Sequence, residues 1–250
     1  MKRYWDKFND IFSSTLIAPQ YFLKKYENEA ILSTLKIKGD IIVDIGCGRQ
    51  KYKNILLSKY KKYIGIDHPD VSKKYQNKDM PDILADAVKI PLKSNYADTT
   101  IMISVLEHLP KPQLALNEAY RITKNGGSIC LITVQNYILH DVPYDYFRYT
   151  KYSLEKMLTE SGFKITKIKP LGNYFELTGQ YFNIYLLYRA KSLINNKSLI
   201  KKMCGIVFLF PIGVVCLISN ILVYLLNHIF KNNNNGEFAI YNLAIAKKLK

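Results

Sequence analysis

Cysteine is scarce in this chain, and the four cysteines lie far apart. They are Cys47, Cys130, Cys204 and Cys216. No two of them form a CxxC pair, and none joins a histidine at the spacing of a zinc site. This argues against a zinc module and indicates a reduced domain that faces the cytosol. We expect no bound metal.

Acidic residues are also few, with 20 Asp and Glu against 36 Lys and Arg. The resulting net charge of +16 predicts attraction to anionic partners such as nucleic acid, anionic lipid or phosphorylated metabolites. A biased coding composition, rich in Lys, Asn, Ile and Tyr, explains much of the same excess as solvated surface. Charge alone therefore does not choose a partner.

The first residues lack the unbroken apolar stretch of a signal peptide. Between Met1 and Ser14, the run Trp5-Asp6-Lys7 and then Asp10 interrupt any such stretch. We expect no secretion signal.

What is present suits one α/β domain with an appendage, since the chain has 250 residues of which 48% are apolar. Short β-branched runs alternate with polar or helical stretches, which predicts βαβ units and a mainly parallel sheet. Strands are predicted at Ile41–Ile45, Tyr63–Ile66, Ile83–Ala85, Thr99–Ile103, Ser128–Thr133 and Phe163–Lys169.

Two helices are predicted between the later strands. Pro112 suits the first turn of a helix that reaches Lys124, and Gly126-Gly127 are expected to end it. Ser153 is expected to cap the next helix, which stops at Gly162. A further helical region is predicted before the first strand.

The stretch from Met203 to Phe230 contains no Asp, Glu, Lys or Arg. Its 28 residues exceed the ~20 that cross a bilayer. A buried core helix is the alternative, but a helix apolar on nearly every face lacks cover in a domain this small. Between Glu176 and Lys202 the chain carries basic residues and no acid, as expected of a cytoplasmic flank. These features predict a membrane contact, with the rest of the chain in the cytoplasm.

The last apolar run, Phe238 to Ala246, predicts a final strand. If it completes the same sheet, the apolar stretch must return to its starting side. Pro211 and Gly213 offer a break at which a short re-entrant or interfacial hairpin can turn back. We favour this return over a single crossing.

The run Val43-Asp44-Ile45-Gly46-Cys47-Gly48-Arg49-Gln50 stands where a strand ends and a helix is expected to begin. Glycines at such a corner allow a tight turn and close approach to a ligand. A dinucleotide fingerprint requires a small residue at the position of Lys51, so NAD and FAD are disfavoured. Asp44 suits a ligand with a cationic amino-acid part.

Two more acids end the next strands. Asp67 follows the second strand at the spacing at which an acid reaches ribose hydroxyls. Asp86 ends the third, where it offers an acceptor to an adenine amino group, with Ala87 beside the ring. Each acid alone also fits a loop cap, but acids at three consecutive strand ends predict a binding site.

With these motifs, the chain resembles the class I S-adenosylmethionine-dependent methyltransferases, specifically type 11-like members of bacterial surface-glycan synthesis. The resemblance covers Asp40 to about Lys169 and the last strand. Besides the glycine run, it rests on Ala85-Asp86-Ala87, Ile90-Pro91-Leu92, Val105-Leu106-Glu107-His108-Leu109 and Arg121-Ile-Thr-Lys-Asn-Gly-Gly. It implies a Rossmann-like, doubly wound α/β fold whose seven-stranded sheet has an antiparallel last strand.

The resemblance also implies S-adenosylmethionine as the cofactor. It assigns Gly46 and Gly48 to the methionine part, Asp67 to the ribose, Asp86 and Ala87 to the adenine, and Leu106 to the wall below the sulfonium. The predicted cofactor-binding set also includes Asp44, from its suitability for the ammonium end, and Cys47 between the two glycines. Gln50 replaces a glycine found in many members, which predicts a narrower or differently tilted loop. A fold that persists without cofactor binding is the alternative.

The loop from His140 to Thr150 lies where an acceptor binds in such a fold, and it resembles the corresponding loop of polysaccharide-associated methyltransferases. His140 is predicted to take a proton from an acceptor hydroxyl, with His108 as a second candidate. The predicted acceptor-binding residues are Tyr144 and Tyr146, which stack on a sugar, and Arg148, which grips a phosphate or carboxylate. In the alternative, the loop is a packed lid and these side chains are structural.

Methyl transfer from a sulfonium is an in-line displacement, so the protein mainly aligns the reactants. We expect O-methylation of a sugar or lipid-linked glycan at the cytoplasmic membrane face. The alternatives are methylation of a membrane quinone or lipid, methylation of RNA, and a non-catalytic membrane adaptor. A nucleic-acid partner is not expected, because no RNA-binding module is recognisable and the basic stretch adjoins the apolar run.

The sequence thus predicts five regions. They are an N-terminal helical region (1–38), the methyltransferase core (39–170), a basic and aromatic helical linker (171–202), a membrane segment (203–230), and a return loop with the last strand (231–250).

Overall fold

The computed structural model describes residues 14–72, 80–196, 198–230 and 235–249. Nearly all of the segment that bears on a secretion signal lies outside these residues. The chain forms two compact units. The sheet unit comprises Glu27–Gln135, Leu139–Leu171 and Tyr241–Lys250, and the helical unit comprises Met1–Tyr26, Asn136–Ile138 and Gly172–Ile240.

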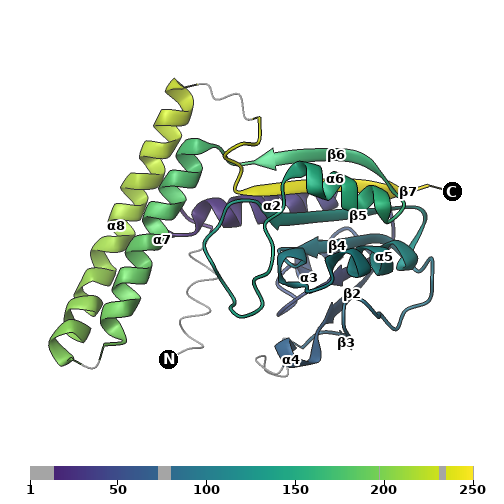
Figure 1. Cartoon of the computed structure of the whole chain (residues 1–250), viewed down its shortest axis with the longest axis horizontal. Helices are drawn as coiled ribbons and strands as arrows, with labels where there is room; N and C mark the ends of the chain where they lie inside the picture. The colour runs from purple at the N-terminus through teal and green to yellow at the C-terminus, as the bar shows by residue number, and fades with distance from the viewer. Residues whose placement is uncertain (1–13, 73–79, 197, 231–234, 250) are drawn as a thin grey trace. The chain divides into compact units, whose positions relative to one another are not determined.

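The sheet unit contains a seven-stranded sheet in the order β3-β2-β1-β4-β5-β7-β6 (Figure 1). Its strands are β1 (Ile41–Ile45), β2 (Lys62–Asp67), β3 (Ile83–Leu84), β4 (Ala97–Ile103), β5 (Thr123–Val134), β6 (Phe163–Leu171) and β7 (Tyr241–Lys248). The first five strands pair in parallel, and β7 lies antiparallel between β5 and β6. The predicted Rossmann-like sheet with an antiparallel last strand is confirmed.

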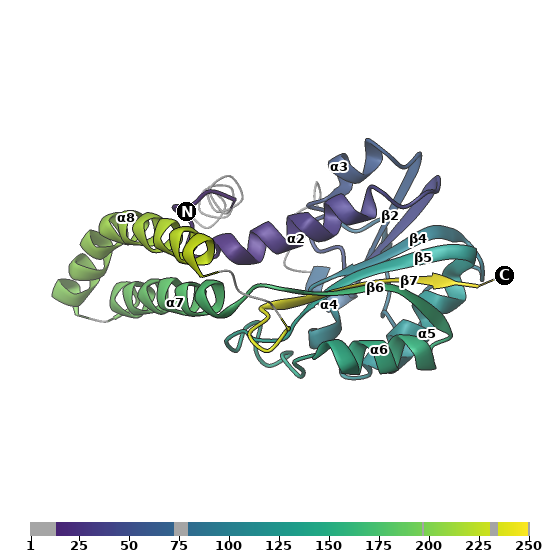
Figure 2. The ribbon, with the colours of Figure 1, turned by 90° about the horizontal axis from the view of Figure 1, so that it is seen from above.

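Helices cover both faces of this sheet. Figure 2 shows α5 (Pro112–Ile122) and α6 (Lys151–Glu160) on one face and α3 (Lys53–Leu57) on the other. The part of α2 (Tyr21–Thr34) that belongs to the sheet unit shares the face of α3. Strand β1 is buried along nearly its whole length, which explains its unbroken apolar sequence. The short α4 (Pro69–Ser72) follows β2.

Two predicted helix ends are wrong. Helix α5 ends at Ile122, and β5 has begun at Thr123, where the backbone is extended. Thr123 pairs with Ala97 and Ser128 with Thr99, so Gly126-Gly127 lie in an irregular stretch of strand and do not end the helix. At α6 the cap is Thr150 instead of Ser153. The Thr150 hydroxyl oxygen accepts a hydrogen bond from the Ser153 amide at 3.2 Å, which places Ser153 in the first turn.

In the helical unit, α7 (Tyr174–Ile194) and α8 (Leu199–Ile229) lie side by side as an antiparallel hairpin (Figures 1 and 2). Helix α8 continues through Pro211, so the predicted break at Pro211 and Gly213 is wrong. Because α7 and α8 are antiparallel, the chain reverses its direction between them. Packing of Ile212 and Cys216 against Ala190 supports α8 next to the proline, where one helical hydrogen bond is missing.

Helix α8 buries a polar side chain and exposes several apolar ones. Asn220 is fully buried and bonds to Asn183 across the hairpin at 2.9 Å and to the Leu16 carbonyl at 2.7 Å. On the outside of α8, by contrast, Ile218 and Leu222 are 61% and 52% exposed. In the described part of the chain, one helical stretch, Pro211–Ile229, is long and apolar enough to cross a membrane, and 22% of its apolar window is buried. A core helix would be mostly buried.

Candidate functional site

The glycine corner links the ends of β1, β2 and β4. The amides of Gly46 and Cys47 both donate to the Ile66 carbonyl, at 2.8 and 3.0 Å, and so turn the chain over the end of β2. Gly46 has a φ of +75°, and a Cβ at this position would lie 2.4 Å from Cγ2 of Val105. Glycine is therefore required for both backbone conformation and space. Cys47, in the same turn, is buried.

Gln50 adopts a backbone conformation that favours glycine. Its φ is +54°, in the left-handed region, which costs roughly 1–2 kcal/mol for a residue with a Cβ. The Gln50 side-chain amide donates to the Met80 carbonyl and ties the corner to the segment before β3. The left-handed turn is thus kept in this chain despite the missing glycine.

Asp44 is a buried carboxylate at the end of β1. Its Oδ2 accepts a hydrogen bond from the Tyr63 hydroxyl at 2.7 Å. Burial raises the pKa of Asp44 to about 7, and the nearby charge of Asp67 adds to the rise, while the bond from Tyr63 opposes it. A cationic group placed here would favour the charged carboxylate.

Asp67 connects the end of β2 to the glycine corner. Its Oδ2 accepts from the Gly48 amide at 2.8 Å, and its Oδ1 accepts from the His68 amide at 2.7 Å. Burial raises the pKa of Asp67, although both backbone bonds oppose the rise. Since each carboxylate oxygen has a second lone pair, Asp67 can still accept hydrogen bonds from two hydroxyls.

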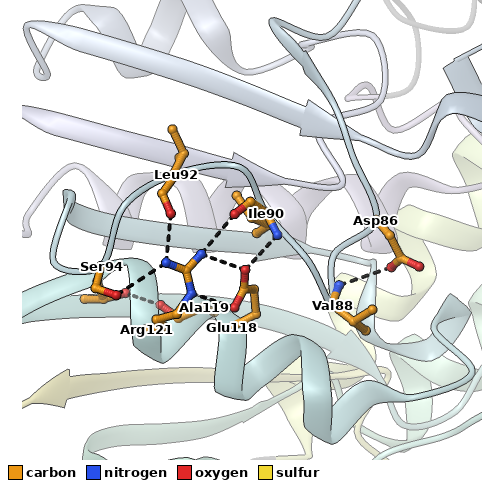
Figure 3. A network of polar contacts seen from close by, with 9 residues as sticks. Asp86, Val88, Ile90, Leu92, Ser94, Glu118, Ala119 and Arg121 are labelled. Carbon is orange, nitrogen blue, oxygen red and sulfur yellow. Dashed lines mark hydrogen bonds and ion pairs between the residues drawn. The ribbon is translucent and has the colours of Figure 1, made fainter.

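The third predicted acid, Asp86, lies in a turn after β3 that α5 holds in place. Asp86 is exposed, and its Oδ1 accepts from the Val88 amide at 3.1 Å. Next along the chain, the Arg121 guanidinium donates to the carbonyls of Ile90 and Leu92 at 2.9 and 2.8 Å (Figure 3). Arg121 also pairs with both carboxylate oxygens of Glu118.

The Glu118 carboxylate also receives the Ile90 amide at 2.7 Å. Glu118 and Arg121 therefore clamp the loop that follows Asp86 and Ala87, of which Ala87 is half-buried. This clamp explains why the Ile90-Pro91-Leu92 and Arg121 motifs occur together.

Asp82 is a site neighbour that sequence reasoning missed. Its Oδ2 accepts from the Gly65 amide at 2.8 Å, and its Oδ1 lies 3.1 Å from Nζ of Lys53. Burial raises the pKa of the Cys47 thiol, and the charges of Asp44, Asp67 and Asp82 add to the rise, so these acids surround the corner. Nothing in the sequence distinguishes Asp82 from a surface acid.

Leu106, predicted below the sulfonium, lies in the short helical turn η2 (Leu106–His108) after β4. Its side chain is buried in the main core of the sheet unit. The Leu106 carbonyl accepts from the Tyr149 hydroxyl at 3.2 Å, which attaches the acceptor loop to this turn.

A second cluster joins Glu107 and His108 to His140, which follows β5. One ligand-type atom from each of the three residues lies within 4.8 Å of the other two. The imidazole centroids of His108 and His140 are 4.7 Å apart, edge to face. The structure thus brings together both histidines that the sequence singled out. Glu107 is fully buried, which raises its pKa, and its Oε2 accepts from the Thr133 hydroxyl at 2.6 Å.

Asp145, which sequence reasoning also missed, organises the acceptor loop. Its carboxylate forms a two-point pair with the Arg148 guanidinium at 2.6 and 2.8 Å, which lowers the pKa of Asp145. The same carboxylate lies 3.3 Å from Nδ1 of His140. An incoming phosphate must therefore compete with Asp145 for Arg148. Tyr144 and Tyr146, by contrast, are exposed and accessible to a ligand.

Comparisons with known proteins agree with this geometry. Residues 43–131 match the family model described as a methyltransferase domain. The chain is 36% identical over 137 residues to the tRNA (carboxymethyluridine(34)-5-O)-methyltransferase of Arabidopsis thaliana, covering 53% of this chain and 31% of that protein. It is 42% identical over 50 residues to the chloroplastic 2-methyl-6-phytyl-1,4-hydroquinone methyltransferase of Spinacia oleracea, covering 20% of this chain and 14% of that protein.

A solved structure of a SAM dependent methyltransferase from Archaeoglobus fulgidus superimposes with a TM-score of 0.58. The two chains are 20% identical, and the match covers 98% of this chain and all of the other. At this identity the likeness is one of fold.

Residues 43–131, which include the glycine corner, thus match a methyltransferase domain. The fold of the chain is similar to that of the solved SAM dependent methyltransferase. The predicted methyltransferase domain is confirmed over residues 43–131, and this match agrees with S-adenosylmethionine as its cofactor. The chain spans less than a third of each of these two curated relatives.

Proposed function

We propose that this chain transfers the methyl group of S-adenosylmethionine to a hydroxyl oxygen of a sugar or lipid-linked glycan at the cytoplasmic membrane face. The observation that supports the transfer is the arrangement of Asp44 and Asp67 around the Gly46–Gly48 corner. Both carboxylates are buried beside a turn in which a side chain at Gly46 has no room.

Each acid has a distinct task in this proposal. Asp44 pairs with the ammonium group of the cofactor, and Asp67 accepts hydrogen bonds from its ribose hydroxyls. Asp86 and Ala87 border the adenine, in the turn that the Glu118–Arg121 clamp holds. When bound, the cofactor supplies a methyl group on a sulfonium. The new carbon–oxygen bond forms as the carbon–sulfur bond breaks, and S-adenosylhomocysteine and a proton are released.

The acceptor site in this proposal is the cluster of Glu107, His108 and His140. Both histidines act on the acceptor hydroxyl, and the exposed rings of Tyr144 and Tyr146 contact the sugar. Arg148 fixes the loop through Asp145, and an anionic acceptor would compete with Asp145 for its guanidinium.

The membrane location rests on the exposed apolar side chains of α8, such as Ile218 and Leu222. Apolar side chains that point outward gain from burial in lipid at roughly 25 cal/mol per Å². In water they would form a large exposed apolar patch, which soluble monomers rarely present. Exposed aromatic rings of α7, such as Phe182 and Tyr185, suit the membrane–water interface, and Arg189 and Lys191 suit anionic headgroups.

A tRNA acceptor is the second candidate, supported by the tRNA-modifying relative and by the net charge of +16. The hydroquinone relative supports a membrane quinone in the same way, over a shorter match.

The experiment that tests the proposal combines binding with product analysis. Isothermal titration should show one S-adenosylmethionine site, which Asp67→Ala weakens severely. Mass spectrometry of glycan, lipid and tRNA fractions from cells with and without the gene should show a 14-dalton loss in the glycan fraction. A loss in the tRNA or quinone fraction replaces the proposed acceptor, and unchanged binding by Asp67→Ala overturns the cofactor assignment. Cofactor binding with no altered fraction favours a non-catalytic adaptor.

A further inference from the structure

We infer that Glu107, His108 and His140 form a binding site for a divalent transition-metal cation. A ligand-type atom from each residue lies within 4.8 Å of the other two, so a cation between them would reach all three after small side-chain movements. The inference deepens the proposed function, since it says how the histidines act on the acceptor. It departs from the sequence-based expectation of no metal, which considered only spacing along the chain.

The buried carboxylate is the first observation that points to a ligand. Glu107 is fully buried, and its Oε1 has no hydrogen-bond partner among the described residues. Its other oxygen, Oε2, is held by the Thr133 hydroxyl at 2.6 Å. Leaving a buried polar atom unpaired destabilises the fold, and a charged group does so more strongly. A cation bonded to Oε1 removes this cost.

The surroundings of the two imidazoles are the second observation. Metal-bound histidines usually present their second ring nitrogen to a carbonyl or carboxylate, which fixes the ring and its tautomer. Nδ1 of His108 lies 2.8 Å from the Tyr144 carbonyl oxygen, and Nδ1 of His140 lies 3.3 Å from the Asp145 carboxylate. In both rings Nδ1 therefore has a contact typical of the second nitrogen of a metal-bound histidine. This leaves Nε2 of each ring as the atom that binds the cation.

The donor set selects the class of cation. Two imidazoles and one carboxylate suit manganese, iron, cobalt or zinc as dications, whereas calcium and magnesium prefer sites made of oxygen. Three protein ligands leave coordination positions for an acceptor oxygen. Because His108 and His140 are half-buried, solvent and an acceptor can reach the cluster from the side of the imidazoles.

The cation would act directly on the acceptor. An acceptor hydroxyl bound to it has a lowered pKa and loses its proton to water. The resulting oxygen forms its bond to the methyl carbon as the carbon–sulfur bond breaks, and the electron pair of that bond remains on sulfur. His108 and His140 are then ligands and not proton acceptors.

The test is metal binding by the full chain in detergent, after chelator treatment and dialysis. Titration with Mn²⁺ followed by electron paramagnetic resonance, and with Co²⁺ followed by visible absorbance, should show one bound ion per chain. Glu107→Gln and His140→Ala should each weaken metal binding at least tenfold. Loss of a residue that only contacts a metal ligand typically weakens metal binding by about 10–100-fold. His228→Ala is the matched control and should bind like the wild type, because His228 lies on α8.

Circular dichroism checks that each variant folds. If Glu107→Gln fails to fold because Glu107 is buried, His140→Ala still tests the metal site. S-adenosylmethionine titration on the same samples separates the two proposals. Intact cofactor binding without a stoichiometric metal overturns the metal site alone, and so does metal binding that all variants retain. Loss of cofactor binding in the wild type overturns the proposed function instead.

Discussion

The Tyr63 hydroxyl and the Asp44 carboxylate lie 2.7 Å apart, and this bond joins the second strand to the end of the first. It is the main interaction that favours the charged form of Asp44. Burial opposes it and raises the pKa of Asp44 to about 7. The carboxylate is therefore close to its titration midpoint in neutral solution. Its charge is available to a cationic ligand only when the proton leaves.

Cofactor affinity should accordingly depend on pH through Asp44. We expect affinity for S-adenosylmethionine to rise from pH 6 to pH 8, because deprotonated Asp44 attracts the ammonium group. Tyr63→Phe removes a hydrogen-bond donor to the charged carboxylate, and such a bond is worth roughly 1.5–3 kcal/mol. The pH at which affinity rises should therefore increase by about one unit or more. Isothermal titration at several pH values measures both curves.

Tyr96→Phe is the matched control, since the Tyr96 hydroxyl accepts a hydrogen bond at 2.8 Å from Nζ of Lys62, the neighbour of Tyr63 on β2. Its curve should coincide with that of the wild type. Identical curves for Tyr63→Phe and the wild type contradict the assignment of Asp44 to the ammonium group.

The glycine corner gives a second prediction. Gly46→Ala should destabilise the fold by roughly 2–4 kcal/mol and abolish cofactor binding, because its Cβ meets Val105 in addition to the strained φ. Gly126→Ala has almost the same φ, +79° against +75°, but its Cβ has nothing within 4 Å. It should lose only about 1–2 kcal/mol. Urea denaturation compares the two, and equal losses contradict a steric role for Val105.

The third prediction concerns the clamp between α5 and the loop after β3. Arg121→Met should destabilise the protein by about 1–3 kcal/mol, mainly through the unpaired carbonyls of Ile90 and Leu92. The Glu118 pair itself adds little, because the Arg121 side chain is 36% exposed. Affinity for S-adenosylmethionine should also fall as the turn carrying Asp86 loosens.

Lys156→Met provides the control for this clamp. Lys156 makes an exposed pair with Glu160 at 3.8 Å on the same helix, so its loss should change stability by less than about 0.5 kcal/mol. Should Arg121→Met match this control in urea denaturation, the clamp has no structural role.

The sequence predicts well those features that depend on neighbours along the chain. The β-branched runs locate the strands of the sheet, and the Gly46–Gly48 spacing locates the corner, because both follow from local backbone preference. Contacts between segments that are distant along the chain are harder to predict from the sequence. The imidazoles of His108 and His140 meet only because the loops after β4 and β5 leave one edge of the sheet, and Asp82 reaches Gly65 across paired strands.

Pro211 is a case in which a local sequence signal predicts a feature that tertiary packing overrides. A proline followed by glycine locally predicts a break, yet α8 continues because packing against α7 outweighs one missing hydrogen bond. The buried Asn183–Asn220 pair is equally invisible in a hydropathy profile, although it reveals which side of the hairpin faces inward.

That orientation leads to the last prediction, on membrane binding. The full chain should sediment with vesicles that contain phosphatidylglycerol. The double variant Ile218→Lys with Leu222→Lys should bind at least tenfold less, because a lysine in the bilayer costs roughly 2.5–3.5 kcal/mol at the centre and less near the surface. Both positions are exposed and one helical turn apart, so thermal stability in detergent should stay unchanged. Leu114→Lys is the control, since Leu114 is 48% exposed on α5. If the double variant sediments like this control, the outer face of α8 is not in contact with lipid.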